Sequence, residues 1–197
     1  VPAFIGKAFY LFKSKVLPFF GITFRLPSDT LFQLTDFFTM FYFSFISKNH
    51  YHDSQFWTHS QNSPAHNAWA GLAFEKLCLS HLPQMKQRLG IAGVQTNACS
   101  WRSRPGSQRV QIDLLIDRKD ETVNLCEMKF SRSEYEIDSD EEQKILRRLD
   151  VFQNETGTSK SIILTMVTTS GLKRNSHSDI IQSVITIDDL FAPPFVL

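Results

Sequence analysis

The chain lacks the features that mark disulfide-stapled proteins, zinc proteins and P-loop ATPases. Its cysteines, Cys78, Cys99 and Cys126, lie in apolar segments without C-x-x-C spacing, which predicts reduced, buried thiols. No G-x-x-x-x-G-K-[ST] sequence occurs among these residues, because Gly6-Lys7 lacks the upstream glycine and the following hydroxyl. The net charge is only +1, so any surface that binds nucleic acid must be a local patch.

Apolar runs long enough to cross a membrane are missing too. The phenylalanines lie mostly before Trp57, and residues 31–46 are rich in them, but this run is too short for a span and contains Gln33 and Asp36. Lysines interrupt residues 3–24, and no cleavage site of small residues follows them. We therefore expect a cytoplasmic protein with no membrane partner. We expect residues 31–46 to form a strand that runs into a buried helix, with excess aromatic surface that favours a homo-oligomer.

Two neighbouring segments, 111–117 and 123–130, contain the residues that point to chemistry. Both have the apolar or alternating composition of strands, and the short charged link between them predicts a β-hairpin. A loop centred on Asp120 places opposite each other the residues whose numbers sum to 240. Asp113 would then face Glu127, with Cβ atoms about 5 Å apart. The two carboxylates repel, and a cation such as Mg²⁺ between them would turn that repulsion into a binding site.

Strand alternation also predicts which neighbours these acids have. Gln111, Asp113 and Leu115 would share one face of the first strand, and Glu127 would share a face with Lys129 on the second. Lys129 would then stand beside the acids, where it can hold a phosphate or an attacking water, as in a metal-dependent phosphodiesterase. The alternative is a solvated sheet face on which Lys129 is a simple cross-strand partner. The apolar residues on the same face favour the first interpretation, because acids at the end of a buried surface need a partner or a metal.

A third acid lies in an expected helix at residues 65–82. The apolar stripe of this helix is interrupted by Glu75 at a position where a leucine is expected. The stripe consists of Ala68, Leu72, Glu75, Leu79 and Leu82. Glu75 is either a ligand of a metal or its water, or the partner of a nearby basic or backbone group, and both alternatives point it inward.

These residues resemble the PD-(D/E)XK nuclease superfamily. The order is similar: a helix with Glu75, a strand, a strand with Asp113, a strand with Glu127 and Lys129, a helix and a strand. More closely, residues 68–75, 111–118 and 124–130 resemble the C-terminal nuclease-like domain of prokaryotic, Bacteroidetes-type AAA-family ATPases. The resemblance covers roughly residues 31–191. It departs at Ile112, where the superfamily's name puts a proline, and in the missing ATPase.

The resemblance implies a fold, a cofactor and a role for each residue. It implies an α/β, restriction-endonuclease-like mixed sheet flanked by helices at 65–197, a linker at 48–64, and a small winged-helix remnant with an aromatic helix at 1–47. Asp113 and Glu127 match the metal ligands, with the Met128 carbonyl, and Glu75 matches the helix-borne acid that holds a second ion or its water. Lys129 matches the catalytic lysine, and the cofactor would be Mg²⁺ or Mn²⁺.

The missing ATPase leaves three origins open: a fragment of a longer product, a truncated gene or a stand-alone remnant. An ATPase domain acting in trans is therefore an expected partner. Two functions remain open as well. One is an Mg²⁺-dependent, endonuclease-like hydrolase of phosphodiester bonds. The other is a catalytically inactive module that binds nucleic acid or regulates the ATPase.

The remaining segments fit the same domain. Ser139 and Glu142 have capping-box spacing and start an expected helix whose buried stripe is Ile145, Leu146, Leu149 and Phe152. Residues 161–168 form an apolar, β-branched run typical of a central strand. Nucleic acid, with DNA favoured, would be held through its backbone by local basic residues, unless their charges are only solvated surface. These residues are Arg102, Arg104, Lys144, Arg147 and Arg148, the last three on the outer side of the expected helix.

Overall fold

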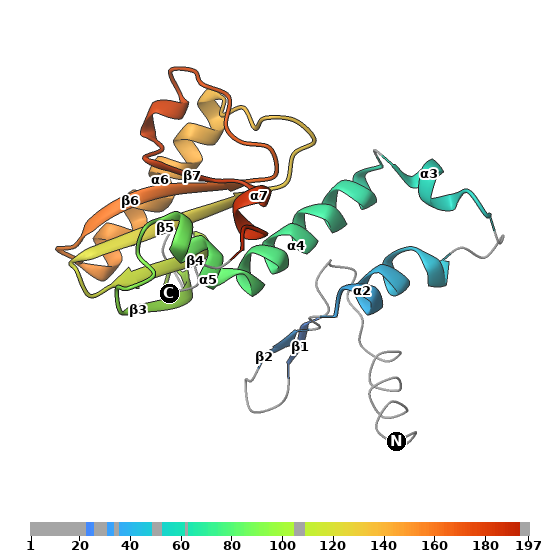
Figure 1. Cartoon of the computed structure of the whole chain (residues 1–197), viewed down its shortest axis with the longest axis horizontal. Coiled ribbons are helices and arrows are strands. Elements are labelled where there is room, and N and C mark those ends of the chain that lie inside the picture. Colours follow the sequence, from blue (N-terminus) through green and yellow to red (C-terminus); the bar gives the residue numbers. More distant parts are fainter. Residues whose placement is uncertain are drawn as a thin grey trace. The chain divides into compact units, whose positions relative to one another are not determined.

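The computed structural model describes residues 36–48, 53–61, 63–104 and 109–193, and the backbone of two short strands before them (Figure 1). The chain divides into two compact units, Val1–Leu72 and Ala73–Leu197. The division falls within helix α4 (Pro64–Ser80), which therefore contributes residues to both units.

The first unit has a small sheet followed by short helices. Strand β1 (Thr23–Arg25) pairs antiparallel with β2 (Leu31–Gln33), and helix α2 (Phe37–Ser44) follows, which confirms the expected strand-to-helix order. A 3₁₀ turn η1 (Ile46–Lys48), helix α3 (Phe56–Ser60) and the first part of α4 complete the unit. Most of the expected winged-helix remnant lies outside the described residues.

Helix α2 is less buried than expected. Asp36 caps its N-terminus, because the Asp36 carboxylate accepts the Thr39 N–H at 2.6 Å and so satisfies an N-terminal donor. Met40 is buried, whereas Phe38 and Tyr42, one turn apart, are 68% and 40% exposed. The helix therefore packs on one side only and leaves aromatic rings in solvent on the other.

Aromatic rings build the core of the first unit. Phe41 of α2 and Phe45, which follows the helix directly, meet Trp57 of α3 edge-on, with ring centroids 5.0 and 5.4 Å apart. Trp69 of α4 lies 5.6 Å from each of the two phenylalanines, and the His66 ring lies 5.0 Å from Trp57. Trp57 belongs to the stretch expected to be a linker, so part of that stretch contributes to a packed core.

The second unit is a five-stranded mixed sheet flanked by helices, as the sequence and the resemblance predicted. The strands follow chain order across the sheet: β3 (Thr96–Arg102), β4 (Gln111–Arg118), β5 (Thr122–Lys129), β6 (Ser161–Thr168) and β7 (Ser183–Ile185). The first three pair antiparallel, and β5, β6 and β7 pair parallel. The arrangement is consistent with a restriction-endonuclease-like fold. Strand β6 has the expected bounds and is largely buried.

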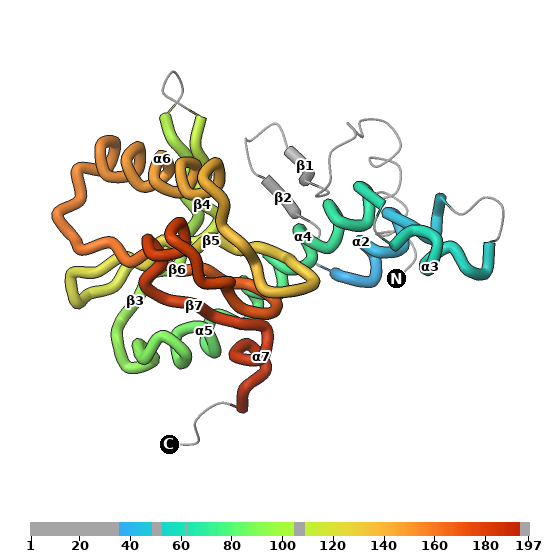
Figure 2. Tube along the Cα trace, turned by 90° about the horizontal axis from the view of Figure 1, so that it is seen from above, coloured from blue at the N-terminus to red at the C-terminus, as the bar shows by residue number. Residues whose placement is uncertain are grey.

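Helices cover both faces of this sheet (Figure 2). Helix α6 (Ser139–Thr156) packs Ile145 and Phe152 against Leu115 and Leu125 on one face. On the other face lie the C-terminal part of α4, α5 (Leu82–Arg88) and the short α7 (Ile187–Leu190). Two apolar clusters, one on each face, therefore hold the sheet in place.

The structure corrects the buried faces expected for two helices. On α4 the buried residues are His66, Ala70, Phe74 and Cys78, at every fourth position, whereas Leu79 is 41% exposed. On α6, Ile145 and Phe152 are buried as expected, but Leu146 is 41% exposed. The expected stripe of α4 was therefore placed on the wrong side of the buried face, and the expected stripe of α6 was too wide.

One cysteine also differs from the expectation. All three are free, and Cys78 and Cys126 are buried as predicted, but Cys99 is exposed on strand β3 at the edge of the sheet. Burial raises the pKa of the Cys78 thiol to about 12, which keeps this thiol protonated.

No helix in the described part of the chain is long and apolar enough to cross a membrane.

Candidate functional site

The hairpin of β4 and β5 has the predicted register. Leu114 pairs with Cys126, Leu115 with Leu125, and so on to Asp117 with Val123, and the numbers of each pair sum to 240. The last observed pair, Leu114 with Cys126, directly adjoins Asp113 and Glu127, the pair that the sequence predicted. The turn that joins the strands contains Glu121 in the left-handed region, with φ 59°.

A bulge interrupts β4 at Asp113. On the neighbouring strand β3, Cys99 lies opposite Leu115 and Trp101 opposite Ile112, so Asp113 and Leu114 together face Ser100. Ile112 and Leu115 therefore pack on the same face of the sheet, with α6. A bulge of this type bends the strand and changes the direction of a side chain, and bulges are common beside active sites.

The bulge corrects the alternation expected for this strand. Leu115 packs on the α6 side, whereas Leu114 packs on the side of α4 and α5. Asp113 keeps Gln111 as its neighbour, because the Gln111 amide donates to an Asp113 carboxylate oxygen at 2.6 Å. The prediction that Gln111, Asp113 and Leu115 form one regular row is therefore wrong at Leu115.

Glu75, Asp113 and Glu127 share one electrostatic environment. Burial, followed by the negative charge of Asp113, raises the pKa of Glu75 to about 7. Burial also raises the pKa of Glu127, with a contribution from Asp113, although Arg148 and Lys129 oppose the shift. Glu75 is half-buried. The helix and the two strands thus gather three acidic side chains that repel one another.

Helix α6 provides charged partners for both Glu127 and Lys129. The Arg148 guanidinium donates to a Glu127 carboxylate oxygen at 3.1 Å, and the Lys129 ammonium lies 2.6 Å from a Glu141 oxygen. Burial disfavours the ammonium, but the contact with Glu141 outweighs this effect and raises the pKa of Lys129. Lys129 therefore carries its positive charge at neutral pH.

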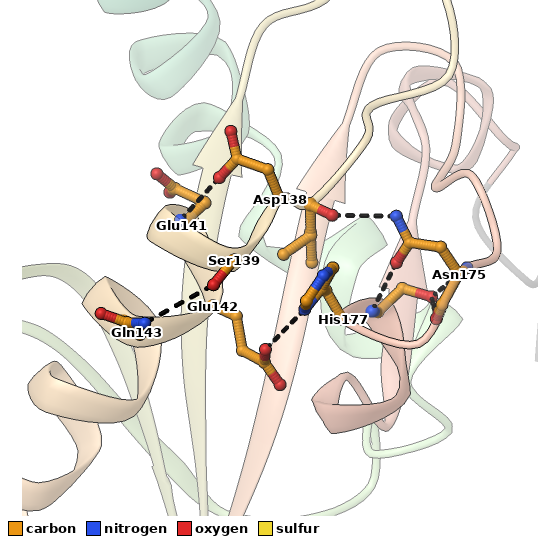
Figure 3. Close-up of polar contacts among 9 residues, drawn as sticks. Asp138, Ser139, Glu141, Glu142, Gln143, Asn175 and His177 are labelled. Atoms are coloured by element: carbon orange, nitrogen blue, oxygen red, sulfur yellow. Dashed lines mark hydrogen bonds and ion pairs between the residues drawn. The ribbon is translucent and has the colours of Figure 1, made fainter.

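The N-terminus of α6 is fixed by contacts that the sequence did not reveal (Figure 3). Asp138, rather than the expected Ser139, caps the helix by accepting the Glu141 N–H at 2.8 Å. Glu142 accepts from His177 Nδ1 at 2.7 Å, and the Asn175 amide donates to the Ile137 carbonyl at 2.9 Å. These bonds tie the loop after β6 to the helix that holds Glu141.

The predicted nucleic-acid-binding residues are dispersed. Arg148 faces Glu127 rather than the outer side of α6, so its expected placement is wrong. Lys144 is 61% exposed and lies 3.7 Å from Glu141. The Arg104 guanidinium donates to the Glu155 carbonyl at 3.2 Å, and Arg102 is exposed at the end of β3. Arg102, Arg104, Lys144 and Arg147 are the exposed cations of the predicted set within the described residues.

Three residues near the site were missed from the sequence: Glu141, which contacts Lys129, and Asp138 and Tyr135. Burial raises the pKa of Tyr135. The charge of Lys129 opposes this shift and the charge of Glu141 adds to it, so the Tyr135 hydroxyl lies in the same charged environment as Lys129 and Glu141. Only the acid-rich first turn of α6, Asp140 to Glu142, gave a signal, and it is typical of any helix N-terminus.

The oxygen atoms that these acids offer are ligands of the type that a hard divalent cation prefers. Asp113, Glu127 and Glu75 offer carboxylate oxygens, and their mutual repulsion is the imbalance that such a cation offsets. Within the described residues, no three His, Cys, Asp or Glu side chains are grouped closely enough to hold a metal ion as they stand. Glu127 is instead engaged by Arg148.

Replacing Glu75 with glutamine should remove a pH-dependent loss of stability. Its pKa of about 7 lies above the ordinary 4.5, so the folded protein holds this proton to a higher pH than the unfolded chain does. Stability therefore falls as the pH rises from about 4.5 to about 7, by up to about 3 kcal/mol for this group. Urea unfolding in EDTA should show that the free energy of unfolding of Glu75→Gln rises relative to that of the wild type as the pH rises across this window. The control variant Glu134→Gln, at an exposed position, should show no such rise. A difference that is independent of pH would contradict the shift.

The comparison with protein families finds one family that covers the candidate site. Residues 42–145, just over half of the chain, match a family of archaeal and bacterial proteins of unknown function, DUF234. The chain belongs to the DUF234 family. The region that matches the DUF234 family contains the residues of the candidate site, namely Glu75, Asp113, Glu127, Lys129 and Glu141. No curated protein matches the chain.

Proposed function

We propose that this DUF234 protein hydrolyses phosphodiester bonds of nucleic acid with Mg²⁺ or Mn²⁺, as a PD-(D/E)XK nuclease-like domain of the kind found in AAA-family ATPases. The observation that supports the proposal is the hairpin register, whose last pair, Leu114 with Cys126, directly adjoins Asp113 on its bulge and Glu127. Glu75 and Lys129 share the electrostatic environment of these two acids. The resemblance stated from the sequence assigns the same four residues to such a site.

Each residue has a distinct role in the proposed reaction. Asp113, Glu127 and the Met128 carbonyl would hold the cation, with Glu75 holding a second ion or its water. When bound, the cation would lower the pKa of a water molecule and offset charge on the phosphate. Lys129 would orient the phosphate or the water as a fixed positive charge, because its raised pKa makes it a poor base.

Nucleic acid would be held mainly through its backbone. Arg102, Lys144 and Arg147 are exposed, and cations of this kind contact phosphates with little sequence preference. DNA is the substrate that we propose, with an ATPase domain or a second copy of the chain as protein partners. The exposed rings of Phe38 and Tyr42 would provide the surface for a second copy.

A second function is favoured by a specific observation. Glu127 and Lys129 both form ion pairs with side chains on α6, so these two charges are balanced without a cation. A domain of this type could bind nucleic acid, or regulate an ATPase, without turnover. The two proposals differ in one outcome, which is whether bonds are broken.

Nicking of supercoiled plasmid separates the two functions. In Mn²⁺ or Mg²⁺ we expect nicking that EDTA stops, and Asp113→Ala should lower its rate by about a hundredfold, since a lost ligand removes transition-state charge stabilisation. Asp117→Ala is the matched control, because Asp117 lies on the same strand but pairs with Lys160 at 2.7 Å. Plasmid binding without nicking would favour the binding module, and nicking that survives both EDTA and Asp113→Ala would exclude the proposed site.

A further inference from the structure

A single face of α6 contacts both Glu127 and Lys129. Glu141 and Arg148 are seven residues apart, about two helical turns, and therefore lie on the same side of the helix. Glu141 lies 2.6 Å from Lys129, and Arg148 lies 3.1 Å from Glu127. The Glu127 side chain is only 10% exposed, and a carboxylate at such a position needs a counter-charge. Arg148 supplies this charge at the carboxylate that the proposed function assigns to a cation.

We propose that Arg148 changes partners when the site is loaded, an inference that rests on the proposed function. In the cation-free protein Arg148 neutralises Glu127. When a divalent cation occupies Glu127, Arg148 is released and binds a phosphate of the nucleic acid. Arg148 thereby couples cation binding to nucleic-acid binding.

Electrostatics favours this exchange of partners. At equal distance, a double positive charge attracts a carboxylate about twice as strongly as a guanidinium does. In its ion pair with Glu127 the Arg148 side chain is 26% exposed, and leaving this part-buried charge without an anion is costly. A phosphate restores the balance, because its oxygens match the planar donor fork of arginine. The partial exposure gives the guanidinium access to such a ligand.

The exchange predicts a reciprocal coupling. If a cation tightens nucleic-acid binding by some factor, nucleic acid must tighten cation binding by the same factor. Loss of Arg148 should move the two affinities in opposite directions. Without nucleic acid, the cation should bind more tightly because its competitor is gone. The gain in nucleic-acid affinity caused by the cation should shrink because the released ligand is gone. A residue that only supported the structure would weaken both.

The test measures both affinities in the full chain with Ca²⁺ as the probe cation. Calorimetry gives the Kd for Ca²⁺, and polarisation of a fluorescent DNA duplex gives the Kd for DNA with Ca²⁺ or EDTA at fixed ionic strength. In the wild type we expect Ca²⁺ to tighten DNA binding by about tenfold. In Arg148→Gln we expect Ca²⁺ alone to bind about threefold more tightly, and the tenfold coupling to fall to about twofold.

A matched control removes the same charge from another ion pair. Arg88 Nε lies 3.0 Å from an Asp189 oxygen, and Arg88→Gln should keep the wild-type coupling. If Arg148→Gln does not fold, Arg148→Lys is the variant that tests the partner exchange, because lysine keeps the positive charge beside Glu127 but lacks the planar donor fork of arginine. It should keep the Ca²⁺ affinity and lose most of the coupling.

The outcomes separate this inference from the proposed function. Full coupling in Arg148→Gln or Arg148→Lys, or weaker Ca²⁺ binding in Arg148→Gln, overturns the partner exchange alone. If the wild type does not bind Ca²⁺, or if Glu127→Gln leaves its affinity for Ca²⁺ unchanged, the proposed function is overturned and the partner exchange with it.

Discussion

Replacing Lys129 with alanine is expected to lower the rate of metal-dependent nicking by about a thousandfold, within the range that a positioned charged or acid–base group contributes. The lysine follows Glu127 by two residues on β5, and its ammonium lies 2.6 Å from Glu141, so its position is fixed by a strand and a helix. A shorter side chain removes the charge that orients the phosphate. Single-turnover rates on plasmid, measured at saturating protein, would report this loss without a contribution from binding.

Lys160→Ala is the control for this substitution. Lys160 Nζ lies 2.7 Å from an Asp117 oxygen and its side chain is 22% exposed, close to the 26% of Lys129. Both variants lose a part-buried ion pair, so both should lose similar stability. Lys160 differs in position, because its partner Asp117 lies at the end of β4 away from Asp113. Equal losses of activity in the two variants would show that the effect of Lys129 is structural.

The hairpin could be predicted from the sequence because its signals are local. The charged link between two apolar segments set the register, and four observed pairs sum to 240 as predicted. Strand β6 was predicted with its observed bounds because it is apolar along its whole length and pairs on both sides. Such features depend on neighbours along the chain and on a period of two.

The details that shape the site depend on distant residues. The bulge at Asp113 arises from the pairing of β4 with β3, and β3 carries no sequence signal that sets this register. Arg148 was expected on the outer side of α6, because a charged residue beside a buried stripe usually faces water. Its partner Glu127 lies 21 residues earlier on another element. Contacts between elements decide where such a side chain points.

Trp57→Ala is expected to unfold the first unit locally and to leave the second unit intact. Trp57 contacts Phe41, Phe45, His66 and Trp69, with ring centroids 5.0 to 6.1 Å apart. Removal of a tryptophan from such a cluster costs about 3 kcal/mol or more, which is a large share of the stability of a small unit. Amide hydrogen exchange should therefore accelerate in α2, α3 and the start of α4.

The same experiment tests whether the two units are independent in stability. Exchange in β4, β5 and β6 should stay at the wild-type rate, because their two apolar clusters include none of these five aromatic residues. Phe38→Ala is the control on α2, since its ring is 68% exposed and little packing is lost. Acceleration in the strands of the second unit, or none in α2 and α3, would contradict the prediction. The expected pattern would mean that Glu75, Asp113, Glu127 and Lys129 keep their framework when the aromatic core is lost, so the proposed chemistry would depend on the second unit alone.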